Sequence, residues 1–250
     1  MRPTREYIRV YVWELPVRLF HWINALSILA LAVTGYLIAN PPAFMSQQDA
    51  SMGYWFAKVR FTHFVAAYIF LFVMIMRLYW AFVGNKFARW NNFIPYKPAQ
   101  FKEMLDVLKI EILAFSKKPL HTLGHNVIAY ISYAVMFFLG LFQIVSGFAI
   151  YAQMSSAWLP QQFTWVIPLF GNELTLLNLH YAVMWLFALF TVVHIYLVFF
   201  TDYIDGHGDA SSIIGGWKFL DRHSHAVQTG EGFNALGHNP AKTSKARSHN

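Results

Sequence analysis

Long stretches without a charged side chain constrain this sequence more than any other feature. No Asp, Glu, Lys or Arg occurs in residues 19–48, 61–76, 119–172 and 174–201. A helix of roughly 20 apolar residues crosses a bilayer core, and these stretches approach or exceed that length. Only 12% of all residues are charged, against about 25% in a typical soluble domain. The chain is therefore expected to cross a membrane several times.

Helices account for these stretches, because helices and closed barrels are the only structures that satisfy their backbone hydrogen bonds in lipid. The sequence lacks the many short alternating segments that a barrel requires. The predicted spans are residues 18–39, 61–83, 126–152 and 177–200. We therefore predict an all-α membrane protein with a four-transmembrane-helix bundle.

The positions of Lys and Arg predict the orientation of this bundle. Fifteen of the nineteen lie before the first span, between the second and third spans, or after the fourth, and Arg18 and Arg77 lie at or near the ends of the first and second spans on that same side. The other two lie between the first and second spans. Segments rich in Lys and Arg stay in the cytoplasm. Both termini are therefore expected inside, in a multi-pass protein of the bacterial cytoplasmic (inner) membrane. Because membrane topology explains the net charge of +7, no nucleic acid partner is expected.

Three regions are expected along the chain. Residues 1–17 form a polar cytoplasmic segment, residues 18–220 form the transmembrane domain, and residues 221–250 form a flexible cytoplasmic tail without an apolar period. Between the second and third spans, apolar residues recur at helical spacing from Phe101 to Phe115. This spacing predicts an interfacial helix on the cytoplasmic surface of the membrane.

Histidines inside the spans carry most of the functional information, because an ionisable side chain in a membrane is costly. They are His21, His63, His180 and His194. Along the last span, the fourteen residues from His180 to His194 rise ~21 Å in almost four turns, so both imidazoles leave one face at different depths. The first span starts inside and the second outside. We therefore predict two pairs, His21 with His194 and His63 with His180.

Each pair offers two imidazoles and no thiolate, because the sequence contains no cysteine. Two facing imidazoles suit a six-coordinate haem iron. One alternative is that the histidines only form hydrogen bonds across helices. A proton relay is a weaker alternative, because no Asp or Glu lies in any span to continue it. Four histidines at matched depths favour haem with two histidine ligands.

The residues around His21 form a recognisable pattern. It reads Arg18-Leu-Phe-His21-Trp22-Ile, then Leu26-Ser-Ile, then Leu31-Ala-Val-Thr34-Gly35. This pattern resembles the first signature of the cytochrome b subunits of membrane-bound nickel–iron hydrogenases, which are related to the cytochrome b of formate dehydrogenase. The similarity extends from about Tyr11 to Arg222. Around His180 it is less complete, since Tyr181 replaces a basic residue that is usual in the family.

The resemblance implies a non-catalytic electron-transfer subunit of the respiratory chain that binds two haems b. His63 and His180 would ligate the periplasmic haem iron, and His21 and His194 the cytoplasmic one. Electrons would pass from a periplasmic hydrogenase to the quinone pool. The implied partners are the iron–sulfur small subunit, the nickel–iron large subunit, quinone and membrane lipid.

The related formate dehydrogenase cytochrome implies a quinone site at Gly124, His125 and Asn126. Two other functions remain open at this point. The chain could be the cytochrome b subunit of another periplasmic dehydrogenase or reductase, of the formate or thiosulfate type. It could also be a haem-free membrane anchor.

Overall fold

The computed structural model describes residues 7–43, 54–85, 88–89, 127–205 and 208–221. The expected interfacial helix, the residues after Asp221, and Gly124, His125 and Asn126 lie outside the described residues. The chain divides into two compact units. The helical unit comprises Leu19–Leu78 and Val135–Leu197, and the terminal unit comprises Met1–Arg18, Tyr79–Ala134 and Val198–Asn250.

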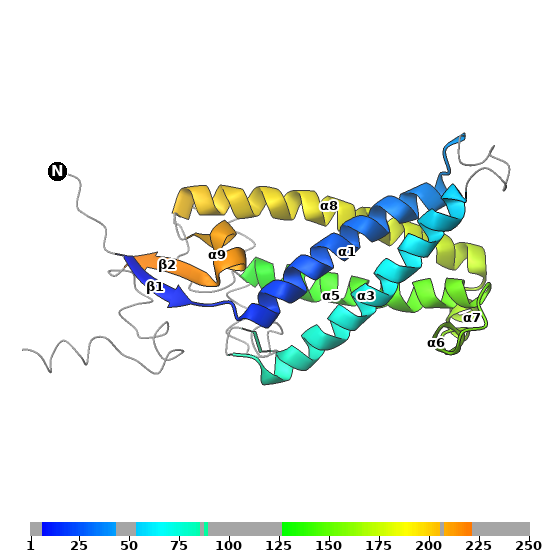
Figure 1. The fold of residues 1–250 in the computed structure, drawn as a ribbon, viewed down its shortest axis with the longest axis horizontal. Helices are drawn as coiled ribbons and strands as arrows, with labels where there is room; N and C mark the ends of the chain where they lie inside the picture. The colour runs from blue at the N-terminus through cyan, green and yellow to red at the C-terminus, as the bar shows by residue number, and fades with distance from the viewer. Residues whose placement is uncertain (1–6, 44–53, 86–87, 90–126, 206–207, 222–250) are drawn as a thin grey trace, which may run out of the picture. The chain divides into compact units, whose positions relative to one another are not determined.

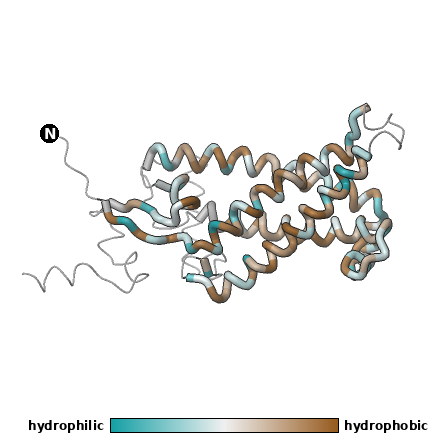
Figure 2. The backbone as a smooth tube through the Cα atoms, in the orientation of Figure 1, coloured by the Kyte–Doolittle hydropathy of each residue, from teal (hydrophilic) through white to brown (hydrophobic). Residues whose placement is uncertain are grey.

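Four long helices supply most of the helical unit. They are α1 (Leu15–Ala39), α3 (Trp55–Val83), α5 (Val127–Ala152) and α8 (Glu173–Asp205). Each contains a segment long and apolar enough to cross a membrane, and Figure 2 shows hydrophobic residues along most of their length. The four predicted spans are confirmed as helices.

The helices extend beyond the uncharged stretches that predicted them. Helix α3 begins at Trp55 rather than at the predicted Phe61, so Lys58 and Arg60 lie in its first turns. Similarly, α8 continues to Asp205. Charged side chains mark where a helix meets water, but they are fully compatible with helical backbone. The absence of charged residues therefore predicts where the apolar span lies, but it does not predict where the helix begins and ends.

The core of the helical unit lies between α3 and α5. Phe70 and Met74 of α3 are buried there against Ile144 and Phe148 of α5. A Cβ atom at Gly140 would lie 3.4 Å from both Met74 Cε and Phe70 Cζ. Glycine at this position therefore allows α3 and α5 to approach closely, as small residues do between membrane helices.

Two one-turn helices join α5 to α8, namely α6 (Trp158–Gln161) and α7 (Val166–Leu169) (Figure 1). Val166 is buried in one cluster with Ala149 of α5 and Leu176 of α8. The sequence predicts only a loop here. Periodicity could not reveal these helices, because each has four residues and a helical pattern needs a longer window.

The terminal unit contains a two-stranded sheet that the sequence patterns do not predict. Strand β1 (Tyr7–Tyr11) pairs antiparallel with β2 (Trp217–Asp221), and Tyr11 lies opposite Trp217. The short helix α9 (Asp209–Gly215) packs against β2 (Figure 1). Because the strands come from opposite ends of the chain, no local turn signal links them. Asp221, where the flexible tail was expected to begin, is the last residue of β2.

Glu14 joins the beginning of α1 to the end of α3 within the terminal unit. Its carboxylate accepts a hydrogen bond from Trp80 Nε1 at 3.0 Å and another from the backbone N–H of Asn85 at 3.0 Å. The Asn85 side chain donates in turn to the carbonyl of Val12 at 3.1 Å. The carboxylate is the charged acceptor of this network, and such hydrogen bonds are stronger than neutral ones.

Gly216 makes the turn from α9 into β2. Its φ is +86°, and its carbonyl accepts hydrogen bonds from the backbone N–H groups of Val12 at 2.8 Å and Trp13 at 3.1 Å. A Cβ atom at this position would lie only 2.6 Å from Tyr11 Cε2 and 2.8 Å from the carbonyl oxygen of Trp13. Both the backbone conformation and the available space therefore require glycine here.

We expect Gly216→Ala to destabilise the terminal unit by about 1–3 kcal/mol, the usual cost of a left-handed conformation without glycine. Gly215→Ala is the matched control, because a Cβ atom there meets nothing within 4 Å and the φ of Gly215 is not positive. Thermal unfolding of the detergent-solubilised variants measures the difference. Equal melting temperatures for the two variants would contradict the role of Gly216.

Candidate functional site

His21 of α1 and His194 of α8 face each other. Their ring centroids are 6.3 Å apart and the ring planes are inclined by 49°. Phe190, one turn earlier on α8, stacks on His194 at 5.4 Å. The Nδ1 atom of His21 is buried and has no hydrogen-bond partner among the described residues. His194 is exposed, and its ring lies near those of both Phe190 and His21.

His63 of α3 is held by the neighbouring helix α1. Its Nδ1 lies 2.9 Å from the hydroxyl oxygen of Thr34. A Cβ atom at the adjacent Gly35 would lie 3.4 Å from His63 Cε1 and 3.6 Å from Met184 Sδ of α8. The dipeptide Thr34-Gly35 therefore supplies both a hydrogen-bonding partner and space for the imidazole.

His180 of α8 is held by α5 in the same way. Its Nδ1 lies 2.8 Å from the hydroxyl oxygen of Ser146. A Cβ atom at Gly147 would lie 3.1 Å from His180 Cε1, closer than an ordinary van der Waals contact. One turn earlier on α5, Gln143 Nε2 donates to the backbone carbonyl of His180 at 3.1 Å. His180 is also close enough to His63 for the two rings to interact electrostatically.

The two hydroxyl groups favour one tautomer of each histidine. Thr34 Oγ1 donates to the carbonyl of Ala30 at 2.5 Å, and Ser146 Oγ donates to the carbonyl of Phe142 at 2.6 Å. A hydroxyl has one proton, so each oxygen then accepts a hydrogen bond from the imidazole. This arrangement favours the tautomer that carries the proton on Nδ1. Its Nε2 keeps a lone pair that can bind a metal.

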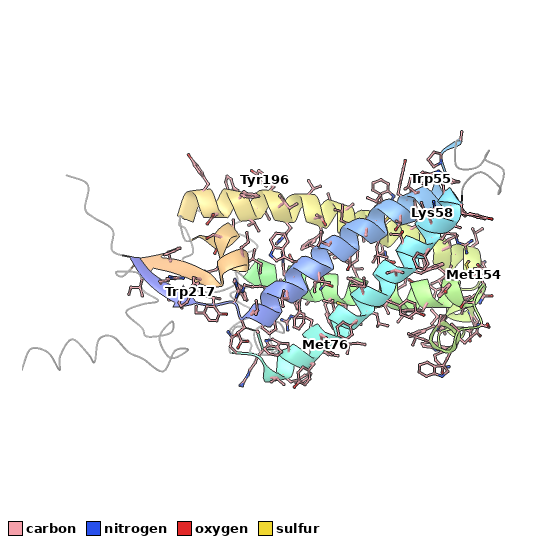
Figure 3. The ribbon with its side chains drawn as sticks, in the orientation of Figure 1. Trp55, Lys58, Met76, Met154, Tyr196 and Trp217 are labelled. Carbon is pink, nitrogen blue, oxygen red and sulfur yellow. The ribbon has the colours of Figure 1, made fainter. Side chains whose placement is uncertain are left out.

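Basic side chains near the start of α3 lie on aromatic rings. Arg60 Cζ is 5.8 Å from the ring centroid of Phe56 and 5.9 Å from that of Phe64. Lys58 Nζ lies 5.4 Å from the ring centroid of Trp55, and both residues are labelled at the start of α3 in Figure 3. Aromatic and basic side chains together are typical of the boundary between membrane and water. Arg60 lies less than one turn from His63 along α3.

The histidine pairs suit haem better than a metal site made only of protein ligands. Among the described residues, no three His, Asp or Glu side chains gather in one place, whereas a haem iron needs only two axial ligands from the protein. Two imidazoles bound to one metal ion at about 2 Å each have ring centroids roughly 6 Å apart. The 6.3 Å between His21 and His194 matches this separation.

The structure brings His21 and His194 together and places His180 close enough to His63 for an electrostatic interaction. The assignment of the four histidines as haem ligands stays a prediction. Thr34 and Ser146 were not recognised as partners of these histidines. A sequence signal for them does exist, because in each case a small hydroxyl residue directly precedes a glycine inside an uncharged span. The glycines also have different roles, since Gly147 faces His180 whereas Gly140 faces the apolar side chains of α3.

Comparisons with known proteins agree with this arrangement. The family model of prokaryotic cytochrome b561 matches residues 12–216. A probable Ni/Fe-hydrogenase B-type cytochrome subunit of Cupriavidus necator is 39% identical, covering 83% of this chain and 86% of the relative. A protein of the same description from Azotobacter vinelandii is 37% identical, covering 87% of this chain and 91% of the relative.

A probable Ni/Fe-hydrogenase 1 B-type cytochrome subunit of Escherichia coli K12 is 33% identical, covering 83% of this chain and 90% of the relative. These relatives confirm the resemblance noted around His21. Together with the four apolar helices, the family match confirms the predicted helical membrane bundle. The chain therefore belongs to the prokaryotic cytochrome b561 family.

Proposed function

We propose that this chain is the non-catalytic electron-transfer subunit of a membrane-bound nickel–iron hydrogenase and that it holds two haems b. The observation that carries the proposal is the presence of two histidine pairs at different levels of α8 in a cytochrome b family member. Three relatives at 33–39% identity are described as cytochrome subunits of Ni/Fe-hydrogenases, which supports the hydrogenase as the partner. When bound, haem supplies one-electron redox chemistry.

The chain contributes axial ligands, spacing and a dry environment. His63 and His180 would hold one haem iron, and His21 and His194 the other. Because α8 is continuous from Glu173 to Asp205, the two levels are separated by ~21 Å along it. Phe187 lies midway between His180 and His194 and is buried. Apolar side chains such as this one exclude water between the two sites, which limits side reactions of the reduced cofactor.

The distribution of cations supports an orientation with both termini in the cytoplasm of a bacterium. In this orientation, the His63–His180 pair lies toward the periplasm, where the iron–sulfur small subunit and the nickel–iron large subunit would bind. Residues 18–220 then form the transmembrane domain. Residues 1–17, which precede it in sequence, and residues 221–250, which follow it, both lie in the cytoplasm. The quinone site at Gly124, His125 and Asn126 remains a prediction on the cytoplasmic side.

Two alternative functions are disfavoured by specific observations. A haem-free membrane anchor would not need four intramembrane histidines, nor the glycines that face His63 and His180. A subunit of a formate or thiosulfate enzyme could carry the same histidine pairs. The names of the relatives favour the hydrogenase over these enzymes.

Copurification tests the proposed partner. The tagged chain is purified in mild detergent from membranes of its own host, and its complex is exposed to hydrogen. We expect the nickel–iron and iron–sulfur subunits to copurify. Hydrogen should reduce the haems, so that the b-type α-band appears, and added quinone should reoxidise them, so that the band disappears. Formate and thiosulfate in place of hydrogen serve as controls. Recovery of a formate or thiosulfate enzyme instead of a hydrogenase would reject the proposal.

Alanine variants of the four histidines test the pairing. His63→Ala and His180→Ala should lose the same component of a redox titration of the haems, whereas His21→Ala and His194→Ala should both lose the other component. The double variant His63→Ala/His180→Ala should lose no more haem than either single variant, because both rings serve one iron. Four variants that all lose one common component would contradict the two pairs.

A further inference from the structure

The two histidine pairs differ in what surrounds their rings. In the His63–His180 pair, both Nδ1 atoms lie within 2.9 Å of a hydroxyl oxygen. In the His21–His194 pair, Nδ1 of His21 is buried without a hydrogen-bond partner among the described residues. Because the axial ligands would be imidazoles at both levels, this difference lies outside the ligands themselves.

Hydrogen bonds to the carbonyls of their own helices do not distinguish Thr34 and Ser146 from other hydroxyl residues of the bundle. Thr62 donates to the carbonyl of Lys58 at 2.9 Å, and Thr191 donates to the carbonyl of Phe187 at 2.8 Å. Such bonds within a helix are common for Ser and Thr in membrane helices. What sets Thr34 and Ser146 apart is that each oxygen also lies against the Nδ1 of a histidine on another helix.

We propose that Thr34 and Ser146 are positioning residues that hold His63 and His180 with Nε2 directed to a haem iron and that lower the reduction potential of that haem. This inference rests on the proposed function, because it requires a haem between the two rings. It adds a role for two residues that are not iron ligands themselves.

The physical reason lies in the proton on Nδ1. An oxygen that accepts a hydrogen bond from this proton draws it partly away from the ring, so the ring becomes a stronger electron donor through Nε2. A stronger donor stabilises the oxidised iron more than the reduced iron, which lowers the reduction potential. The same hydrogen bond fixes the rotation of the imidazole.

Both hydroxyls are themselves well oriented for this role. Each donates its single proton to a backbone carbonyl one turn earlier, at 2.5 Å for Thr34 and 2.6 Å for Ser146. Hydrogen bonds arranged in a chain polarise one another, so the hydroxyl becomes a better acceptor for the imidazole N–H. Gly35 and Gly147, which follow the two hydroxyl residues in sequence, leave room for the rings to approach.

Redox titration of the purified chain with both haems bound tests this inference. Thr34→Val removes the hydroxyl with almost no change in shape, and Ser146→Ala removes it from α5. We expect each variant to shift one haem component to a more positive potential, and the double variant to shift that same component further. The other component should keep its potential. The conservative variants Thr34→Ser and Ser146→Thr should retain the potential of the unmodified chain.

Thr62→Val is the matched control, because Thr62 directly precedes His63 on the same helix but bonds to the carbonyl of Lys58. It should leave both potentials unchanged. Potentials in Thr34→Val and Ser146→Ala that equal those of this control would overturn the inference, even with both haems bound. Absence of haem from the unmodified chain would instead overturn the proposed function.

Loss of the haem from a variant is also informative. If Thr34→Val loses one haem component and Thr34→Ser retains it, the hydroxyl is required to hold His63, as the inference states. If Thr34→Ser loses it and Thr34→Val retains it, the methyl group of Thr34 supports the site by packing, and the positioning role of its hydroxyl is wrong. For His180, loss of one haem component from Ser146→Ala and its retention in Ser146→Thr would show in the same way that the hydroxyl of Ser146 is required.

Discussion

A buried imidazole has two nitrogens, and in a membrane each needs a partner because no bulk water is available to provide one. The site depends on how this requirement is met. For His63 and His180, a hydroxyl on a neighbouring helix occupies Nδ1 and leaves Nε2 for another partner. Haem iron is such a partner, and two Nε2 atoms per haem complete its coordination.

Close approach between helices makes these contacts possible. Gly35 and Gly147 bring the backbones of α1 and α5 next to the rings of His63 and His180, and Gly140 brings α5 next to Phe70 and Met74 of α3. Small residues therefore have two separate roles in the helical unit. One is the packing that holds α3 against α5, and the other is the space in which the imidazoles are oriented.

The apolar spans and the proximity of His21 to His194 could be predicted from the sequence because both follow from regular geometry. Lack of charge identifies a span, and the rise and turn of a helix place His180 and His194 on one face of α8. The β1–β2 sheet could not be predicted, because its two strands are far apart in the sequence and no short turn connects them. Thr34 and Ser146 were missed for a related reason, because a hydrogen bond between helices leaves no periodic pattern in the sequence.

The central claim is that each histidine pair holds one haem. The most direct measurement is the molar ratio of haem to protein in the purified chain after expression with ample haem, with haem measured from its pyridine complex and protein from quantitative amino-acid analysis. The ratio should be close to two, and the dithionite-reduced protein should show a b-type α-band. A ratio of one would leave one pair without its assigned role, and a colourless protein would contradict the account altogether.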